Sequence, residues 1–403
     1  WIEQEHLRFP LTEVPLEVIE RGGALLRSKA FWLGVSAPVM LFGVNGINHF
    51  FLVPGELAHY FDMSSVLTDD PWRAMAPLES RFIFYFSPLL IGVTYLLSVE
   101  VSFSTWFFFM VTRLQLLYAE LIGRADDHGS FVGLGAQWRE WPNFFPHLQA
   151  QTRGALLTLA VIYLWRARSA CLEAAREGKG AWLLLSGFAL MVLWGVAAGL
   201  PTWMSVLYFS LLLLTTVGMM RLRLDAGLPV TAIYFLTGNL FFFVAGSGPG
   251  VFSRSEYVAL AFLTALNYTG IGAIAMLQFE GFKMASVLKT GRQGLVTLLS
   301  LGVVLGLVTG AWSLLSVVYE HGLFTLDQQG AARSAARLGR YYHYLYSEVG
   351  TRAAGTDWDR LAAIGFGGAT AAVLSYLRLV FVRFPFHPAG FVYGTGLGTL
   401  IWG

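Results

Sequence analysis

Residues 81–121, RFIFYFSPLLIGVTYLLSVEVSFSTWFFFMVTRLQLLYAEL, decide the fold, because two apolar runs meet there at a short polar hinge. The first run, Phe82 to Ser98, has about the minimum length that crosses a hydrocarbon core roughly 30 Å thick. The second run extends from about Ser102 to Leu121. Only residues 99–101 separate the two runs, so we expect two antiparallel transmembrane helices with Glu100 at the turn.

The composition places the whole chain in the same class. Of the 403 residues, 56% are hydrophobic and only 13% are charged, whereas a soluble domain has roughly 25% charged residues. The net charge of +2 does not indicate a nucleic-acid partner. The single cysteine, Cys171, excludes both a disulfide within the chain and a cysteine metal site built by one chain. These features predict an integral membrane protein.

Further apolar runs predict an all-α, polytopic helical bundle with about ten or eleven transmembrane helices, forming a single transmembrane domain over residues 1–403. The run Val230 to Ala245 is short and ends in GSGPG, residues 246–250, so a re-entrant or broken helix is expected near 230–250. The other runs are Phe31 to Val53, Gly154 to Cys171, Ala181 to Leu200, Thr202 to Met220, Tyr257 to Leu277, Gly294 to Tyr319, Leu361 to Val382, and a last run that begins at Gly390.

The distribution of basic residues predicts the orientation. If every run crosses the membrane, one side collects most of the Lys and Arg residues, and the positive-inside rule makes that side cytoplasmic. The loops 54–80, 123–152 and 320–360 then lie outside. Residues 320–360 include a candidate amphipathic surface helix. Because dense aromatics are rarely left in water, four aromatic side chains of loop 123–152 are expected to fold back onto the bundle: Trp138, Trp141, Phe144 and Phe145.

Polar residues inside apolar runs are candidates for a substrate or ion pathway, although helix packing is an alternative reason for each. Glu100 and Glu280 are also candidate proton-coupling groups, unless they are ordinary solvated helix ends. Glycines at four-residue spacing, Gly302, Gly306 and Gly310, favour close approach of another helix. The candidate pathway residues are Asn45, Asn48, Arg113, Gln115, Asn239, Asn267, Tyr268, Gln278 and Glu280.

Arg113 is the most informative of these candidates. It lies about eleven residues into its helix, roughly 16 Å from the turn and near mid-membrane. A guanidinium there should face the bundle and meet a carboxylate, carbonyl oxygens or an anion, with Glu280 or the carbonyls around Asn239 as expected partners. The alternative is a helix that starts later or tilts, so that Arg113 extends to the outer interface.

Four segments together resemble a known family. They are LRFPLTEVPLE (7–17), FSPLLIGVTYLLSVEVSFSTWFFFMVTRLQ (86–115), RLRLDAGLP (221–229) and FPFHPAGFVYG (384–394). Their combination is similar to an uncharacterised prokaryotic membrane family that is described as similar to the oligopeptide transporter superfamily. Members of that family tend to be longer, and the chain starts at Trp1, so it is expected to be an internal fragment of a longer protein. The resemblance implies the fold and a transport role, and it implies no site residues.

No motif in the sequence predicts an enzyme, a metal site or a cofactor. The eight His form no close ligand pair, and no usable nucleotide-binding pattern is present. The first hypothesis is therefore a secondary, ion-coupled transporter for a small peptide or related solute in a prokaryotic inner membrane. The alternative is a structural or accessory subunit of a larger membrane complex. The expected partners are the lipid bilayer, a small-molecule or peptide substrate, and further copies or complex subunits, with no nucleic acid.

Overall fold

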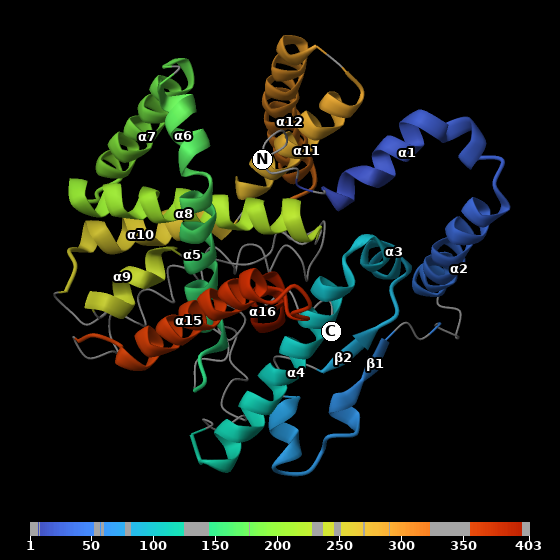
Figure 1. The fold of residues 1–403 in the computed structure, drawn as a ribbon, viewed down its shortest axis with the longest axis horizontal. Helices are drawn as coiled ribbons and strands as arrows, with labels where there is room; N and C mark the ends of the chain where they lie inside the picture. The colour runs from blue at the N-terminus through green and yellow to red at the C-terminus, as the bar shows by residue number, and fades with distance from the viewer. Residues whose placement is uncertain are drawn as a thin grey trace.

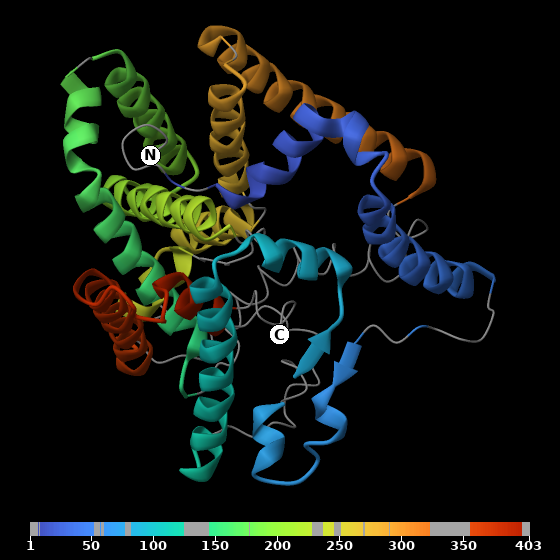
Figure 2. The same ribbon diagram turned by 45° about the vertical axis from the view of Figure 1, so that its right-hand side comes forward.

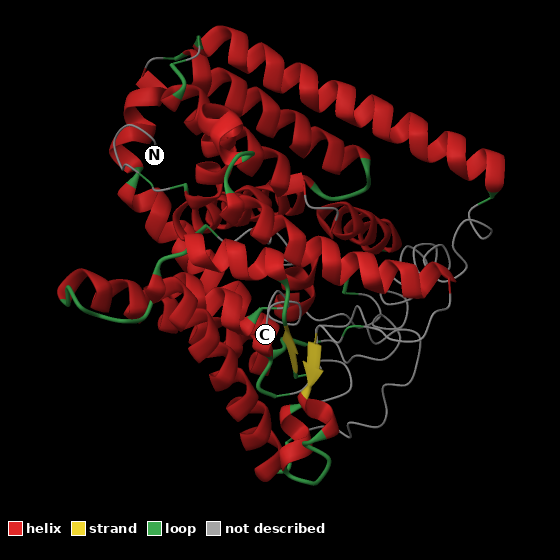
Figure 3. Ribbon diagram, turned by 90° about the vertical axis from the view of Figure 1, so that its right-hand side faces the viewer, coloured by secondary structure: helices red, strands yellow, loops and turns green. Residues whose placement is uncertain are grey.

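The computed structural model describes residues 7, 9–51, 57, 60–76, 82–124, 145–176, 178–227, 237–245, 251–268, 271–289, 291–322 and 355–396. Within these residues the protein is an all-α membrane bundle with one small antiparallel sheet of two strands (Figures 1 and 3). Five described helices are long and apolar enough to cross a membrane: α2, α7, α8, α12 and α15. The predicted fold class is confirmed.

The helices run in chain order as follows: α1 Pro10–Leu25, α2 Lys29–Phe51, α3 Pro88–Leu96, α4 Val99–Leu121, α5 Leu148–Arg166, α6 Arg168–Arg176, α7 Lys179–Ala197, α8 Thr202–Ala226, α9 Thr237–Ala245, α10 Arg254–Tyr268, α11 Ile271–Val287, α12 Arg292–His321, α15 Trp358–Val380 and α16 Pro388–Thr395. Strands β1 (Tyr60–Asp62) and β2 (Ile83–Tyr85) pair antiparallel, and the short 3-10 turns η1 (Met63–Ser65) and η2 (Trp72–Met75) lie between them in the chain.

The opening pair of predicted spans is half correct. The second span is present as α4, which starts at Val99 because the Ser98 side chain accepts a hydrogen bond from the Val101 N–H and caps the helix. The first span is wrong, since β2 takes up the start of the run and α3 has only nine residues. Pro88 lies at the start of α3, a position that proline tolerates. Glu100 therefore lies in the first turn of α4 rather than in a hinge.

Two further boundaries differ from the sequence-based expectation. The charged segment 221–226 continues α8 as helix until Gly227, whose φ of 73° ends it in the left-handed conformation that glycine adopts without strain. The run Tyr257 to Leu277 belongs to two helices, α10 and α11, which run in different directions (Figure 1). Helix α10 packs in an apolar cluster with α9 and the start of α8, whereas α11 contacts α8 and α12. Gln278 and Glu280 consequently lie inside α11 rather than after a helix.

The run Val230 to Ala245 is described only from Thr237 onward, as the nine-residue helix α9. The helix broken near 230–250 is expected to leave helical geometry either at Thr237 to Asn239 or in residues 246–250, and the structure shows Thr237 to Asn239 as helical. The other expected break, in residues 246–250, lies outside the described residues. So do the predicted amphipathic segment within 323–354 and the continuation of the last run beyond residue 396.

Two glycine-mediated helix crossings hold the centre of the bundle together. At the crossing of α5 and α15, a Cβ on Gly367 would lie 2.6 Å from the Gln151 Cα, and one on Gly154 would lie 2.7 Å from the Ile364 carbonyl carbon. At the crossing of α4 and α16, a Cβ on Gly394 would lie 2.6 Å from the Phe108 Cβ. Backbones approach this closely only where small residues stand at the contact.

The described part of loop 123–152 agrees with the expected fold-back. Phe145 contacts Tyr118 of α4, with ring centroids 6.4 Å apart. Its neighbouring aromatics Trp138, Trp141 and Phe144 lie outside the described residues, so their fold-back stays a prediction. The end of the predicted loop is wrong, because residues 148–153 already belong to α5.

Candidate functional site

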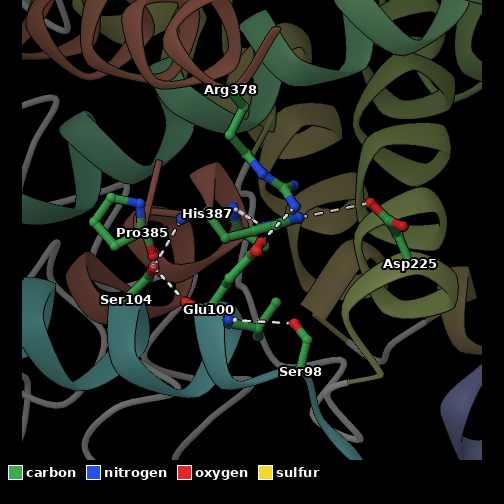
Figure 4. Close-up of polar contacts among 9 residues, drawn as sticks. Ser98, Glu100, Ser104, Asp225, Arg378, Pro385 and His387 are labelled. Atoms are coloured by element: carbon green, nitrogen blue, oxygen red, sulfur yellow. Dashed lines mark hydrogen bonds and ion pairs between the residues drawn. The ribbon is translucent and has the colours of Figure 1, made fainter. Parts of the chain in front are cut away.

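Four helix ends meet around a cavity of about 290 Å³. Each end contributes one charged side chain to the lining: Glu100 from the first turn of α4, Arg166 as the last residue of α5, Asp225 near the end of α8, and Arg378 from the last turn of α15. His387, which precedes α16, completes the charged and titratable lining, and Tyr163 and Ser375 are buried in the same wall (Figure 4 shows the polar contacts).

An ion pair between two helix ends crosses this cavity. Arg378 Nη2 donates a hydrogen bond to Glu100 Oε2 at 2.7 Å, and the two side chains are 36% and 45% exposed. Each charge also suits its own helix, since the dipole favours an anion at the start of α4 and a cation at the end of α15. The pair joins α4 to α15 while remaining accessible to a ligand.

Asp225 lacks that favourable relation to its helix. The dipole of α8 disfavours a negative charge in the last turn of the helix. Groups on the other side of the cavity therefore have to stabilise the Asp225 carboxylate. His387 Nε2 lies 3.8 Å from Asp225 Oδ2, too far for a direct hydrogen bond. The two groups face each other across a gap at the cavity wall (Figure 4).

His387 is held in one orientation by hydrogen bonds on both sides. Its backbone N–H donates to Ser104 Oγ at 2.7 Å, and its Nδ1 accepts from the Ala389 N–H at 3.1 Å, which caps α16. Burial, with the positive charge of Arg378 as a smaller cause, lowers the pKa of His387 to about 3. The imidazole is therefore neutral, and because Nδ1 accepts, the proton is on Nε2 and faces Asp225.

This arrangement can bind a small molecule that carries both signs of charge. The carboxylates of Glu100 and Asp225 suit an ammonium group, and the guanidinium groups of Arg166 and Arg378 suit a carboxylate or phosphate. The described residues contain no group of three or more His, Cys, Asp or Glu side chains that could hold a metal ion. The cavity is thus suited to binding and orienting a ligand.

Among the predicted site residues whose side chains the structure describes, Glu100 alone lines this cavity. Glu280 instead forms a mostly buried, two-point ion pair with Arg223, at 2.7 Å to Nε and 3.3 Å to Nη2, which ties α11 to α8. Gln115 accepts a hydrogen bond from Gln151 Nε2 at 3.0 Å. These contacts are packing contacts between helices.

Arg113 faces the bundle as expected and is only 2% exposed, and the described carbonyl that it meets is that of Met75. Its Nη1 donates to the Met75 carbonyl oxygen at 3.1 Å, and its guanidinium lies over the Phe82 and Phe109 rings at 5.3 and 4.6 Å. The expected partner Glu280 is wrong, because Glu280 pairs with Arg223 instead. Arg113 therefore attaches the segment between β1 and β2 to α4.

The remaining candidates lie elsewhere. The Asn45 side chain holds the Leu57 backbone, donating to its carbonyl at 3.2 Å and accepting from its N–H at 2.8 Å. Asn48 is half-buried on α2 and Gln278 is half-buried on α11. Asn239 belongs to α9, and Asn267 and Tyr268 belong to α10, but their side chains lie outside what the structure describes.

The residues that the sequence reasoning missed are Asp225, His387, Arg378 and Arg166. One available signal could have found them. The alternation of spans that predicts the orientation also puts residues 99–101, Arg166, segment 221–229 and Arg383 on the same side of the membrane. Charged and titratable residues at those positions were therefore candidates for one shared site.

The fold and the apolar helices define the class: the chain is an integral membrane protein built as a helical bundle. Within that class it belongs to a family of unknown function (DUF6785), which matches residues 1–402. No curated protein matches the chain. The resemblance to the oligopeptide transporter superfamily stays a prediction.

Proposed function

We propose that the protein is a secondary transporter in the cytoplasmic membrane of a prokaryote, and that the cavity between α4, α5, α8 and α15 binds its solute. The observation that carries the proposal is the set of opposed charges around this cavity, inside a chain that is otherwise poor in charge. Opposed charges that line one cavity and stay partly exposed are available to a solute that carries both signs of charge. A short peptide or related zwitterion fits both the charges and the family resemblance.

The coupling step would act on the Glu100–Arg378 pair. The sequence contains no usable nucleotide-binding motif, so an ion gradient must supply the free energy. Protonation of Glu100 would remove one charge of the 2.7 Å contact that joins α4 to α15. Releasing Arg378 in this way would free a guanidinium for the acidic group of the solute and loosen one side of the cavity. Glu280 is a weaker candidate because its pair with Arg223 is mostly buried away from the cavity.

Uptake by purified protein in proteoliposomes tests the proposal. An inward proton gradient should drive accumulation of a labelled dipeptide such as Ala-Ala, and Glu100→Gln should reduce that uptake at least tenfold. Glu173→Gln is the matched control, because Glu173 is an exposed carboxylate on α6 that does not line the cavity. Folded protein that accumulates no dipeptide under any imposed gradient, or equal loss in both variants, would refute the proposal.

A second function, a structural or accessory subunit of a membrane complex, is favoured by α12. Three glycines lie on one face of α12: Gly302, Gly306 and Gly310. If each carried a Cβ, no atom of the described chain outside the helix's own backbone would lie within 4 Å of it. Figure 2 shows α12 at the edge of the bundle, beside α11. Purification in mild detergent separates the two functions, because an accessory subunit would always co-purify with large partners and would gain no thermal stability from dipeptides.

A further inference from the structure

We propose that the cavity also binds the headgroup of an aminophospholipid from the surrounding bilayer, with the phosphate at Arg166 and Arg378 and the ammonium at Asp225. This inference goes beyond transport, because a lipid can occupy the cavity whether or not a solute crosses the membrane. It rests on three observations: the level of the cavity mouth, the apolar surface around that mouth, and the arrangement of charge inside it.

The length of α15 indicates that the mouth lies at the level of lipid headgroups. Helix α15 has 23 residues and ends at Val380, a length of about 34 Å, close to the thickness of a hydrocarbon core. Helix α5, which crosses α15 and also lines the cavity, ends at Arg166. Next to it the exposed Trp165 ring lies under the Arg168 guanidinium at 4.7 Å, and both residue types are typical of the membrane interface.

The surface around the mouth is apolar. Leu379, Phe381 and Val382 all line the cavity and are exposed, with Val382 98% exposed. Leaving such side chains in water costs about 1.5–3 kcal/mol each relative to burial. Acyl chains would cover them, so a ligand with a polar head in the cavity and an apolar tail along the end of α15 satisfies both surfaces.

The charges inside match a zwitterionic headgroup. Within the described residues Arg166 makes no hydrogen bond or ion pair, although it lines the cavity. Together with Arg378 it provides two guanidinium groups, which bind phosphate oxygens with good geometry. Asp225, 34% exposed, provides the carboxylate for an ammonium that can donate hydrogen bonds. A choline group has no N–H donor, and a glycerol headgroup has no cation.

The same chemistry predicts competition. A short peptide also carries an ammonium and an acidic group, so the lipid headgroup and the proposed solute would exclude each other from the cavity. A transported solute would then have to reach a concentration high enough to displace the lipid of the bilayer from the cavity. This consequence depends on the proposed function, whereas lipid binding itself does not.

Native mass spectrometry of the purified protein tests the binding. Delipidated protein in detergent receives equal amounts of phosphatidylethanolamine, phosphatidylglycerol and phosphatidylcholine, and the bound lipids are counted. We expect phosphatidylethanolamine to be retained in preference to the other two lipids, and Arg166→Gln to weaken its retention roughly tenfold, the effect of about 1.4 kcal/mol. Arg168→Gln is the matched control, an arginine two residues further on that does not line the cavity.

Asp225→Asn supplies the second measurement. It should abolish the preference for phosphatidylethanolamine over phosphatidylglycerol while leaving the binding of phosphatidylglycerol unchanged. The proposal is overturned if Arg166→Gln leaves the retention of phosphatidylethanolamine intact, or if Arg168→Gln lowers it equally. Soluble glycerophosphoethanolamine binding as tightly as the lipid would assign the site to a free phosphate ester and overturn the lipid assignment. If the protein retains the lipid normally but takes up no dipeptide, the proposed transport function is contradicted and the lipid site is not.

Discussion

His387 shows how one buried residue can shape the site without carrying charge. Its Nδ1 caps α16, its backbone N–H is bonded to Ser104, and its Nε2 faces Asp225. A proton on Nδ1 would break the helix cap and bury a cation next to Arg378. The residue is thus expected to act as a neutral donor at the cavity wall, and its protonation is coupled to the stability of the fold.

Because protonation of His387 is coupled to folding, the free energy of unfolding is predicted to depend on pH. The pKa of His387 is about 3 in the folded protein and about 6.5 in an unfolded chain, so the unfolded state binds more protons between these values. The free energy of unfolding should therefore decrease as pH falls through this window, by about 2 kcal/mol between pH 7 and pH 5.

His387→Asn separates this effect from other titrations, because asparagine can still accept the capping hydrogen bond but does not titrate. Thermal unfolding in detergent at pH 7 and pH 5 should give a smaller loss of stability for the variant than for the wild type. Equal losses in both proteins would contradict the assignment of a buried, neutral imidazole.

Arg113 is predicted to stabilise a loop attachment. Arg113→Ala removes the hydrogen bond to the Met75 carbonyl oxygen and two ring contacts, a loss of roughly 2–3 kcal/mol. Hydrogen exchange should become faster in residues 63–76 and stay unchanged at the cavity. Arg124→Ala is the control, since Arg124 is exposed just beyond the end of α4 and its guanidinium lies over the Phe145 ring, not over residues 63–76. Unchanged exchange in residues 63–76 would exclude this role.

At the scale of elements, glycine spacing alone does not identify a helix contact. The spacing of Gly302, Gly306 and Gly310 predicts a packing face, yet no described part of the chain meets it. The close crossings occur instead at Gly154 and Gly367, and at Gly390 and Gly394. A residue pattern on one helix contains no information about which partner helix approaches it, so only the three-dimensional arrangement distinguishes these faces.

A matched pair of substitutions tests this distinction. Gly367→Ala places a methyl group against the Gln151 backbone, which cannot move aside, and should destabilise the protein by about 1–3 kcal/mol. Gly306→Ala meets open space and should be neutral or stabilising by up to about 1 kcal/mol, because alanine favours helix. The readout is the apparent melting temperature in detergent. A destabilising Gly306→Ala would instead indicate that another subunit covers α12.

At the scale of the whole molecule, the sequence predicted the class and most long helices, because apolar length and low charge follow directly from crossing a membrane. The prediction failed at the run from Phe82, because the length of an apolar run does not reveal that a strand precedes α3. It also failed at Asp225, which lies within the last turn of α8 and not in a loop after it. The site was missed because its residues come from helix ends far apart in the chain, whereas Arg113 stood out only by its position within a run.

The orientation of the molecule is the last prediction, and the single cysteine makes it measurable. Cys171 is exposed on α6, five residues beyond Arg166 at the cavity. The basic residues on this side of the bundle, Arg166, Arg168, Arg176 and Lys179, predict by the positive-inside rule that this end faces the cytoplasm. A membrane-impermeant maleimide should therefore label Cys171 in inside-out vesicles and leave it unlabelled in intact cells.

Thr68→Cys in a Cys171→Ala background provides the opposite reporter, because Thr68 is exposed in the loop 54–80 that is expected outside. It should be labelled in intact cells. Labelling of both reporters from the same face would show that the bundle crosses the membrane a different number of times between them. Labelling of Cys171 in intact cells would show that the cavity opens on the opposite side from the one that the basic residues indicate, and a proton gradient of the opposite direction would be needed to act on Glu100.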